Sequence, residues 1–191
     1  LRIPEMLDGA AEGSVKAMYI MGEDPVLSDP DANHVKHALS NLDFLVVQDI
    51  NLTETAKLAD VVLPATCYAE KDGTFTASER RVQRVRKAVE APGQARLDWT
   101  ILADVSRRLG GKGFDWEKSE DVFDEIRKCM PTYRGITYDK IDKLNGVQWP
   151  CPTAEHPGTK YLHEGKFTRG DKALMVPVEY EGPKELENEE Y

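Results

Sequence analysis

The sequence predicts an α/β fold in which a parallel sheet carries helices on both faces, giving three layers. Three apolar stretches of strand length, "VKAMYIMG", "DFLVVQD" and "DVVLPA", are separated by segments with helical spacing. Strands that alternate with helices are typical of βαβ units, whose strands are parallel. With 191 residues, 40% of them hydrophobic and 31% charged, the chain is long enough to bury one sizeable core.

The first 65 residues supply these elements in order. A helix is expected over residues 4–13, ending at a glycine, and the first strand over residues 15–22. A loop with two prolines then leads to a helix with apolar positions at Val35, Ala38, Leu39 and Leu42. The second strand (43–49), a helix of one to two turns (53–59) and the third strand (60–65) complete a Rossmann-like order, whose crossovers should be right-handed.

The pattern changes after Ala65. Residues 67–89 contain a glycine-centred turn and β-favouring residues, which predict a loop followed by a hairpin. Residues 96–110 predict an amphipathic helix ending at Gly110. Its apolar stripe consists of Leu97, Ile101, Leu102, Val105 and Leu109. A further helix is expected from Ser119, with acidic residues in its first turn, to the residue before Pro131.

Prolines, glycines and tyrosines predominate from Pro131 onward, where only "KALMVPVEY" is strand-like. We therefore expect two parts, an α/β domain over residues 1–130 and an extended arm over residues 131–191. The arm is expected to lead towards a further, C-terminal domain. Both ends of the sequence read as boundaries of a fragment, so the chain is expected to be part of a longer protein.

Composition excludes several classes of function. The net charge of −9 argues against a nucleic-acid partner, since such affinity depends on neutralising phosphates. The basic run "RRVQRVRK" is better explained as a solvated strand or hairpin.

No apolar stretch reaches the length of a membrane span. The three cysteines, Cys67, Cys129 and Cys151, are too dispersed for a disulfide framework or a metal knuckle. We predict neither a catalytic residue nor a metal ligand in this chain.

Two polar turns follow predicted strands, "MGEDP" and "QDINLTET". Ligands of open α/β sheets bind at the carboxyl ends of the strands, where such turns converge. Gly22 allows a ligand to approach the backbone, the helix start at Thr53 and Thr55 offers N–H groups and hydroxyls to a phosphate, and Asp49 suits ribose hydroxyls or the donor edge of guanine. Purely structural roles compete with these, because Thr53 is also suited to cap the short helix and Asp24 to start an Asp-Pro turn. Neither GxGxxG nor a P-loop motif is present.

Four strings in order, "AMYIMGEDP", "VVQDINLTETAKLADVVLPA", "EKDGTFTASERRVQ" and "ARLDW", closely resemble the molybdopterin oxidoreductase family. Four more, "YRGITYDKI", "GVQWPCP", "GTKYLHEGKF" and "KALMVPVEY", resemble the catalytic (alpha) subunits of the formate dehydrogenases in that family. The resemblance covers essentially the whole chain.

The resemblance implies an enzyme that oxidises formate to CO2 and holds molybdenum or tungsten between two molybdopterin guanine dinucleotides. The chain would be an internal fragment, the third domain, that binds one guanine dinucleotide. The residues implied to face it are Gly22, Glu23, Asp24, Gln48, Asp49, Thr53, Lys71 and Asp98. Lys71 is a point charge suited to pyrophosphate. Asp24 departs from the pattern, since many relatives carry asparagine there.

The resemblance also places the catalytic apparatus outside this chain. The 4Fe-4S cluster and the metal ligands would lie in missing parts of the parent, so the fragment alone is expected to be inactive. The implied partners are the remaining domains of the parent and electron-transfer iron–sulfur subunits, with no membrane contact, and the implied location is cytoplasmic.

Two alternatives remain open from the sequence. One is the large iron–sulfur subunit of an NADH–quinone oxidoreductase, which should lack, as a set, the lysine of the "EKxG" turn (Lys71) and the aspartate of "LDW" (Asp98). The other is a scaffold domain without a cofactor, which should have an empty, apolar cleft at the strand ends.

Overall fold

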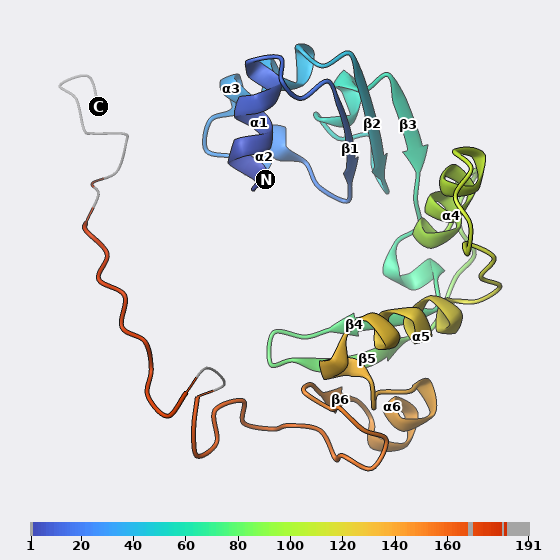
Figure 1. Ribbon diagram of the computed structural model, residues 1–191. Helices are drawn as coiled ribbons and strands as arrows, with labels where there is room; N and C mark the ends of the chain where they lie inside the picture. Colours follow the sequence, from blue (N-terminus) through green and yellow to red (C-terminus); the bar gives the residue numbers. More distant parts are fainter. Residues whose placement is uncertain (1, 168–169, 181, 183–191) are drawn as a thin grey trace.

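The computed structural model describes residues 2–167, 170–180 and 182. Its helices and strands form two lobes, with α4 between them (Figure 1). The first lobe contains α1 (Ile3–Ala11), β1 (Ala17–Met21), α2 (Pro25–Ser28), α3 (Ala32–Ser40), β2 (Phe44–Asp49), the 3-10 turn η1 (Ala56–Leu58) and β3 (Val61–Pro64). The second contains η2 (Tyr68–Glu70), β4 (Gly73–Thr76), β5 (Arg81–Val85), α5 (Ser119–Cys129), η3 (Pro131–Tyr133), α6 (Tyr138–Leu144) and β6 (Val147–Gln148), with α4 (Asp98–Arg108) between the lobes.

The first lobe is built on a parallel sheet with strand order β1-β2-β3. Ala17 lies opposite Phe44, and Val46 lies opposite Val61, so all three strands point the same way. This arrangement confirms the three predicted strands and the mixed α/β class. The predicted short helix before β3 is a single 3-10 turn.

One face of this sheet is covered by helices. Leu45 and Val47 of β2 are buried against α1 and α3, which pack on each other. Side chains alternate along a strand, so their neighbours lie on the other face. There Tyr19, Met21 and Phe44 are exposed. Among the described residues, α1 and α3 thus cover one face, the other face is exposed at these three positions, and the three-layer arrangement is not confirmed.

The second lobe contains the predicted hairpin, in which β4 and β5 pair antiparallel with Gly73 opposite Val85. The two helices predicted after it are confirmed as α4 and α5. The apolar stripe expected along α4 is only partly buried: Ile101 is buried, whereas Leu102 and Leu109 are exposed.

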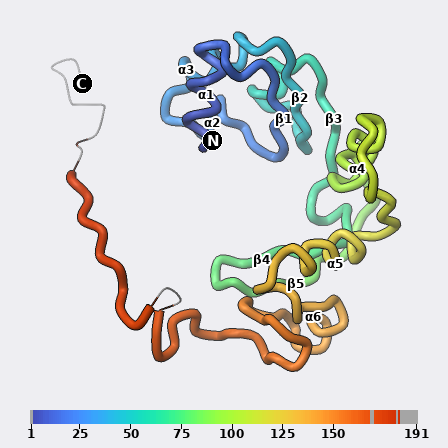
Figure 2. The backbone as a smooth tube through the Cα atoms, viewed as in Figure 1, coloured from blue at the N-terminus to red at the C-terminus, as the bar shows by residue number. Residues whose placement is uncertain are grey.

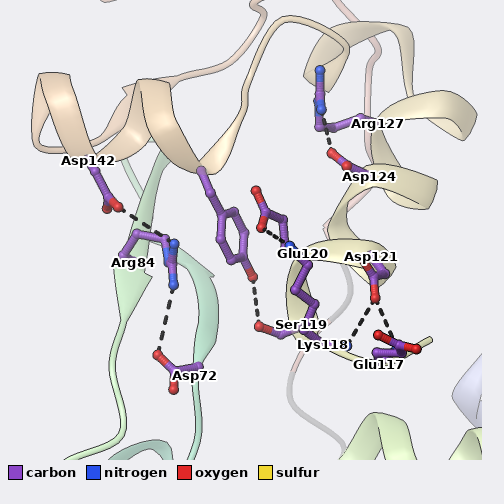
Figure 3. A network of polar contacts seen from close by, with 11 residues as sticks. Asp72, Arg84, Glu117, Lys118, Ser119, Glu120, Asp121, Asp124, Arg127 and Asp142 are labelled. Carbon is purple, nitrogen blue, oxygen red and sulfur yellow. Dashed lines mark hydrogen bonds and ion pairs between the residues drawn. The ribbon is translucent and has the colours of Figure 1, made fainter.

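A separate core holds the second lobe together. Its buried residues are Val82, Phe123, Ile136, Tyr138, Ile141, Val147 and Cys151. Arg84 of β5 lies over the ring of Tyr138, 3.6 Å from its centroid, with carboxylates of Asp72 and Asp142 at 3.8 and 3.7 Å (Figure 3). The Tyr138 hydroxyl lies 3.1 Å from the Ser119 hydroxyl of α5. These contacts tie the hairpin to α5 and α6.

The last third differs from the expected arm. Val147 of β6 pairs with Val82 of β5, so residues 131–151 belong to the second core rather than to an extended segment. The sequence did not indicate α6 and β6 because both are short and are stabilised by distant partners. The expected strand at "KALMVPVEY" is wrong for this structure, where residues 173–180 form neither strand nor helix (Figure 2). The division into a domain (1–130) and an arm (131–191) stays a prediction.

Candidate functional site

The two polar loops begin side by side at the carboxyl edge of the parallel sheet. β1 ends at Met21 and β2 at Asp49. The Gly22 N–H donates to the Gln48 carbonyl at 2.9 Å, which extends the pairing by one residue. The parallel pairing thus places the turn after β1 beside the turn after β2.

Asp24 and Thr55 join these loops. The Oδ1 atom of Asp24 accepts from the Thr55 N–H at 3.1 Å and from the Thr55 hydroxyl at 2.5 Å. The hydroxyl in turn accepts from the Val26 N–H at 3.1 Å. Thr55 is fully buried, so its amide and hydroxyl are not available to a ligand, contrary to the expectation for that position.

Asp49 and Thr53 each shape their own turn. The Asn51 N–H donates to Asp49 Oδ1 at 3.1 Å, and the Ala56 N–H donates to the Thr53 hydroxyl at 3.0 Å. The second contact is the capping role weighed for Thr53, since a side-chain oxygen accepts from an N–H at the start of η1.

A second polar group forms where α4 meets the sheet. Asp98, the first residue of α4, accepts from Gln48 Nε2 at 3.0 Å and from Lys71 Nζ at 2.6 Å. Lys71 also donates to the Thr66 carbonyl at 3.0 Å. Gln48 is fully buried, whereas the side chains of Lys71 and Asp98 are 25% and 28% exposed. The carboxylate at the helix start is also stabilised by the helix dipole.

Tyr19 belongs to this group, although the sequence analysis did not select it. Its hydroxyl donates to Gln48 Oε1. Tyr19 pairs with Val46, two residues before Gln48, so the two side chains share one face of the sheet. Partial burial of the hydroxyl raises the pKa of Tyr19 above its ordinary value, and the Asp98 charge raises it further. Tyr19 lies inside the apolar run of β1, so its position in the sequence gave no sign of a polar site.

The structure thus joins some predicted site residues and leaves others apart. Gln48, Lys71 and Asp98 form one group, which Gly22 meets through the Gln48 carbonyl. The side chain of Asp49 leaves β2 on the opposite face from Gln48 and does not join them. Asp24 and Thr53 stabilise the loops, and Glu23 is exposed.

A cavity of about 810 Å³ adjoins Lys71. Its walls come mainly from the second lobe and from the start of α4, and include Arg84, Trp99 and Ser119. Lys71 is the only predicted site residue that lines it. The hydroxyl of Thr66 and the indole nitrogen of Trp99, both in its wall, are buried without a hydrogen-bond partner among the described residues.

All three cysteines are free thiols. In the described part of the chain, no three His, Cys, Asp or Glu side chains come close enough together to hold a metal ion. No helix formed by these residues has both the length and the apolar character needed to cross a membrane.

The sequence profile of the family described as molybdopterin oxidoreductase matches residues 1–108. The F420-dependent formate dehydrogenase subunit alpha of Methanocaldococcus jannaschii is 56% identical over the whole chain. Formate dehydrogenase H of Escherichia coli is 38% identical over the whole chain, and the assimilatory nitrate reductase catalytic subunit of Bacillus subtilis is 38% identical over 98% of it. The chain spans only about 28% of the length of such relatives.

A likeness in fold extends to a solved structure, acetylene hydratase from Pelobacter acetylenicus. It matches 72% of this chain with a TM-score of 0.59 and 19% identity, and the match covers 19% of that protein.

Proposed function

The chain belongs to the molybdopterin oxidoreductase family, and we propose that it is the part of a formate dehydrogenase alpha subunit that binds the guanine dinucleotide of the cofactor. The observation that carries this proposal is the group of Gln48, Asp98 and Lys71 at the carboxyl edge of the parallel sheet. The identity of 56% over the full chain to one such subunit supports the choice of formate dehydrogenase within the family.

The chemistry of the strand-end residues fits a nucleotide. Lys71 supplies a positive charge for the pyrophosphate. The backbone N–H groups of Glu23 and Thr53 have no partner among the described residues and are free to donate to phosphate oxygens. Gly22 has a φ of 65°, and apart from its chain neighbours no residue has an atom within 4 Å of the position that a Cβ would occupy, so this side of the backbone is open to a ligand.

The carboxylates suit the nucleoside. Asp49 suits ribose hydroxyls or the donor edge of guanine, since only its Oδ1 atom accepts a hydrogen bond, from the Asn51 N–H. Each oxygen of Asp98 already accepts one hydrogen bond, from Gln48 or Lys71, and has a second lone pair for a nucleoside donor. Asp24 fits less directly, because its Oδ1 atom already accepts two hydrogen bonds from Thr55. We assign Asp24 the role of holding the Gly22 loop in place for the ligand.

The cofactor, when bound, supplies a redox-active molybdenum or tungsten centre, and this chain supplies nucleotide binding. We place the metal ligands and the 4Fe-4S cluster in the parts of the parent outside these 191 residues, so the chain alone is inactive in formate oxidation. The proposed partners are those remaining domains and electron-transfer iron–sulfur subunits, in a cytoplasmic enzyme.

The three-layer form of the sheet belongs to the same proposal. The face that bears Tyr19, Met21 and Phe44 is exposed in this chain, and parallel sheets are normally covered on both faces. We assign the second layer of helices to other parts of the parent subunit.

The test is the guanine nucleotide content of the purified full-length subunit, with Lys71→Met compared with wild type. Loss of a charged contact to phosphate, worth about 1.5–3 kcal/mol, should lower cofactor retention at limiting concentration by about tenfold or more. Binding of GDP to the 191-residue chain should weaken and become less dependent on salt, because fewer charges contact the phosphates.

The matched control is Lys57→Met, which removes an exposed lysine paired with Glu54 in the turn after β2. It should leave nucleotide content unchanged. Thermal unfolding of both variants separates lost binding from lost folding, since Lys71 also pairs with Asp98. Equal nucleotide content in wild type and a folded Lys71→Met subunit would contradict the proposed site.

A further inference from the structure

Residues 172–180 expose a run of large apolar side chains. Leu174, Met175, Val176, Val178 and Tyr180 are 68–89% exposed. This segment runs away from both lobes as an open trace (Figures 1 and 2). Among the described residues, no backbone hydrogen bond involves residues 171–180. Both the side chains and the backbone of this segment therefore lack partners within the described chain.

Such exposure is unfavourable for a segment that stays in water. Burying a Leu or Val side chain is worth about 1.5–3 kcal/mol, and several in succession form a patch of the kind that marks an interaction site. The missing partner should therefore provide an apolar surface and backbone groups that can pair.

The alternation of apolar residues in this segment indicates that it is a β-strand when it contacts its partner. Leu174, Val176, Val178 and Tyr180 are all apolar and recur at every second position, so an extended chain places them on one face. The other face bears Ala173, Met175, Pro177 and Glu179, which include a charge and a proline. This is the pattern of a half-buried strand.

Pro177 then fixes which edge of that strand is paired. Proline has no N–H, so within sheets it occurs on edge strands with that position facing solvent. In a strand, the N–H and C=O of one residue point to the same side, and those of the next residue point to the opposite side. If residue 177 faces solvent, the backbone groups of residues 174, 176, 178 and 180 face the neighbouring strand.

We propose that residues 172–180 form an edge strand that pairs with a sheet in a part of the same subunit outside these 191 residues. The length of the relatives supports this choice of partner. The relatives match the whole chain, but the chain spans only about 28% of their length, so most of such a subunit lies outside these 191 residues. Residues 174, 176, 178 and 180 then make two kinds of contact. Their side chains pack on an apolar surface of the partner, and their backbone groups pair with the neighbouring strand.

The proposal is tested by hydrogen exchange at single-amide resolution on the full-length subunit and on the 191-residue chain. In the full-length subunit, the amides of residues 174, 176, 178 and 180 should exchange about 100-fold or more slowly than those of residues 173, 175 and 179. In the 191-residue chain, all of them should exchange at the rate of an unprotected peptide.

Proline substitution in the full-length subunit provides a second, independent test. Val176→Pro removes an N–H that should be paired, so it should abolish the slow exchange of residues 174 and 178. Met175→Pro is the matched control, because its N–H should face solvent, and it should leave that protection intact. If Val176→Pro fails to fold, the exchange pattern of the unmodified subunit still decides the question.

Three outcomes would overturn the proposal. Fast exchange at every position in the full-length subunit would show that the segment is not paired. Equal protection at odd and even positions would exclude an edge strand with this orientation. Alternating protection already present in the 191-residue chain would assign the partner to this chain or, where protection rises with protein concentration, to a second copy.

Discussion

The two lobes differ in how far apart in the sequence their core residues lie. In the first lobe, the core residues fall between Leu7 and Ala56, and α3 packs against both α1 and α2. In the second lobe, Val82 of the hairpin packs with Phe123 of α5 and Val147 of β6. The first core is therefore visible in local hydrophobic periodicity, whereas the second exists only once distant segments have met.

The lobes also differ in the use of their polar groups. At the strand ends of the first lobe, the Glu23 N–H has no partner among the described residues, and the space beside Gly22 is open. In the second lobe, Arg84 lies between Asp72, Asp142 and the ring of Tyr138, so its charge is used within the protein (Figure 3). Lys71 and Asp98 of the strand-end group also pair with each other, but their side chains remain 25% and 28% exposed, against 14% for Arg84.

Truncation of a core residue should have the largest effect and should test whether the two cores are independent. Leu45→Ala in the first lobe and Ile141→Ala in the second both remove a fully buried side chain. Each should cost about 2–5 kcal/mol of unfolding free energy. Hydrogen exchange should show lost protection only in the lobe that carries the substitution. Loss in both lobes after either change would show that the chain unfolds as one unit.

Arg84→Ala should have the next largest effect, about 1–3 kcal/mol, measured by denaturant unfolding. It removes a cation held over Tyr138 and leaves Asp72 and Asp142 without that partner. Arg86→Ala is the matched control, because Arg86 is 62% exposed where Arg84 is 14% exposed, and it should change stability by less than about 0.5 kcal/mol. Equal effects would refute the structural role of Arg84.

Two substitutions at Asp24 test whether it stabilises the fold through its oxygen acceptor or through its negative charge. Asp24→Ala removes the acceptor for the Thr55 N–H and hydroxyl and should cost about 1–2 kcal/mol. Asp24→Asn keeps an oxygen acceptor and should cost less than about 1 kcal/mol. The measurement is thermal unfolding of the first lobe. A larger loss for asparagine than for alanine would contradict this assignment.

The smallest expected effect concerns the pKa of Tyr19, which belongs to the group at the strand ends. The raised pKa of Tyr19 means that the fold favours the protonated phenol, so this contribution to stability is complete below the ordinary value of 10.0 and is lost as the pH rises through the folded pKa. Asp98→Asn should lower the pKa only in part, because burial is the larger cause. NMR titration of labelled tyrosine measures this shift. A Tyr19 pKa at or below the ordinary value would contradict the packing seen around Gln48.

The sequence by itself determined α1, α3 and the three strands of the first lobe, the hairpin, and the helices α4 and α5. It did not indicate α2, which lies in the stretch expected to be a loop. Hydrophobic periodicity of 2 or 3.6 residues is a local property, and Gly22 and Asp49 stand where predicted strands end. The same local information suggested Thr53 as a helix cap, which its contact with the Ala56 N–H confirms.

Only the tertiary structure decided which of these residues meet. Asp98 lies 50 positions from Gln48 and 27 from Lys71. Their meeting depends on the bridge between Ala65 and Arg96, which places the start of α4 beside the end of β3. Tyr19 enters the site because parallel register aligns it with β2. The strand-like residues 173–180 form no strand here, because a strand needs hydrogen bonds from a neighbour that local sequence cannot supply.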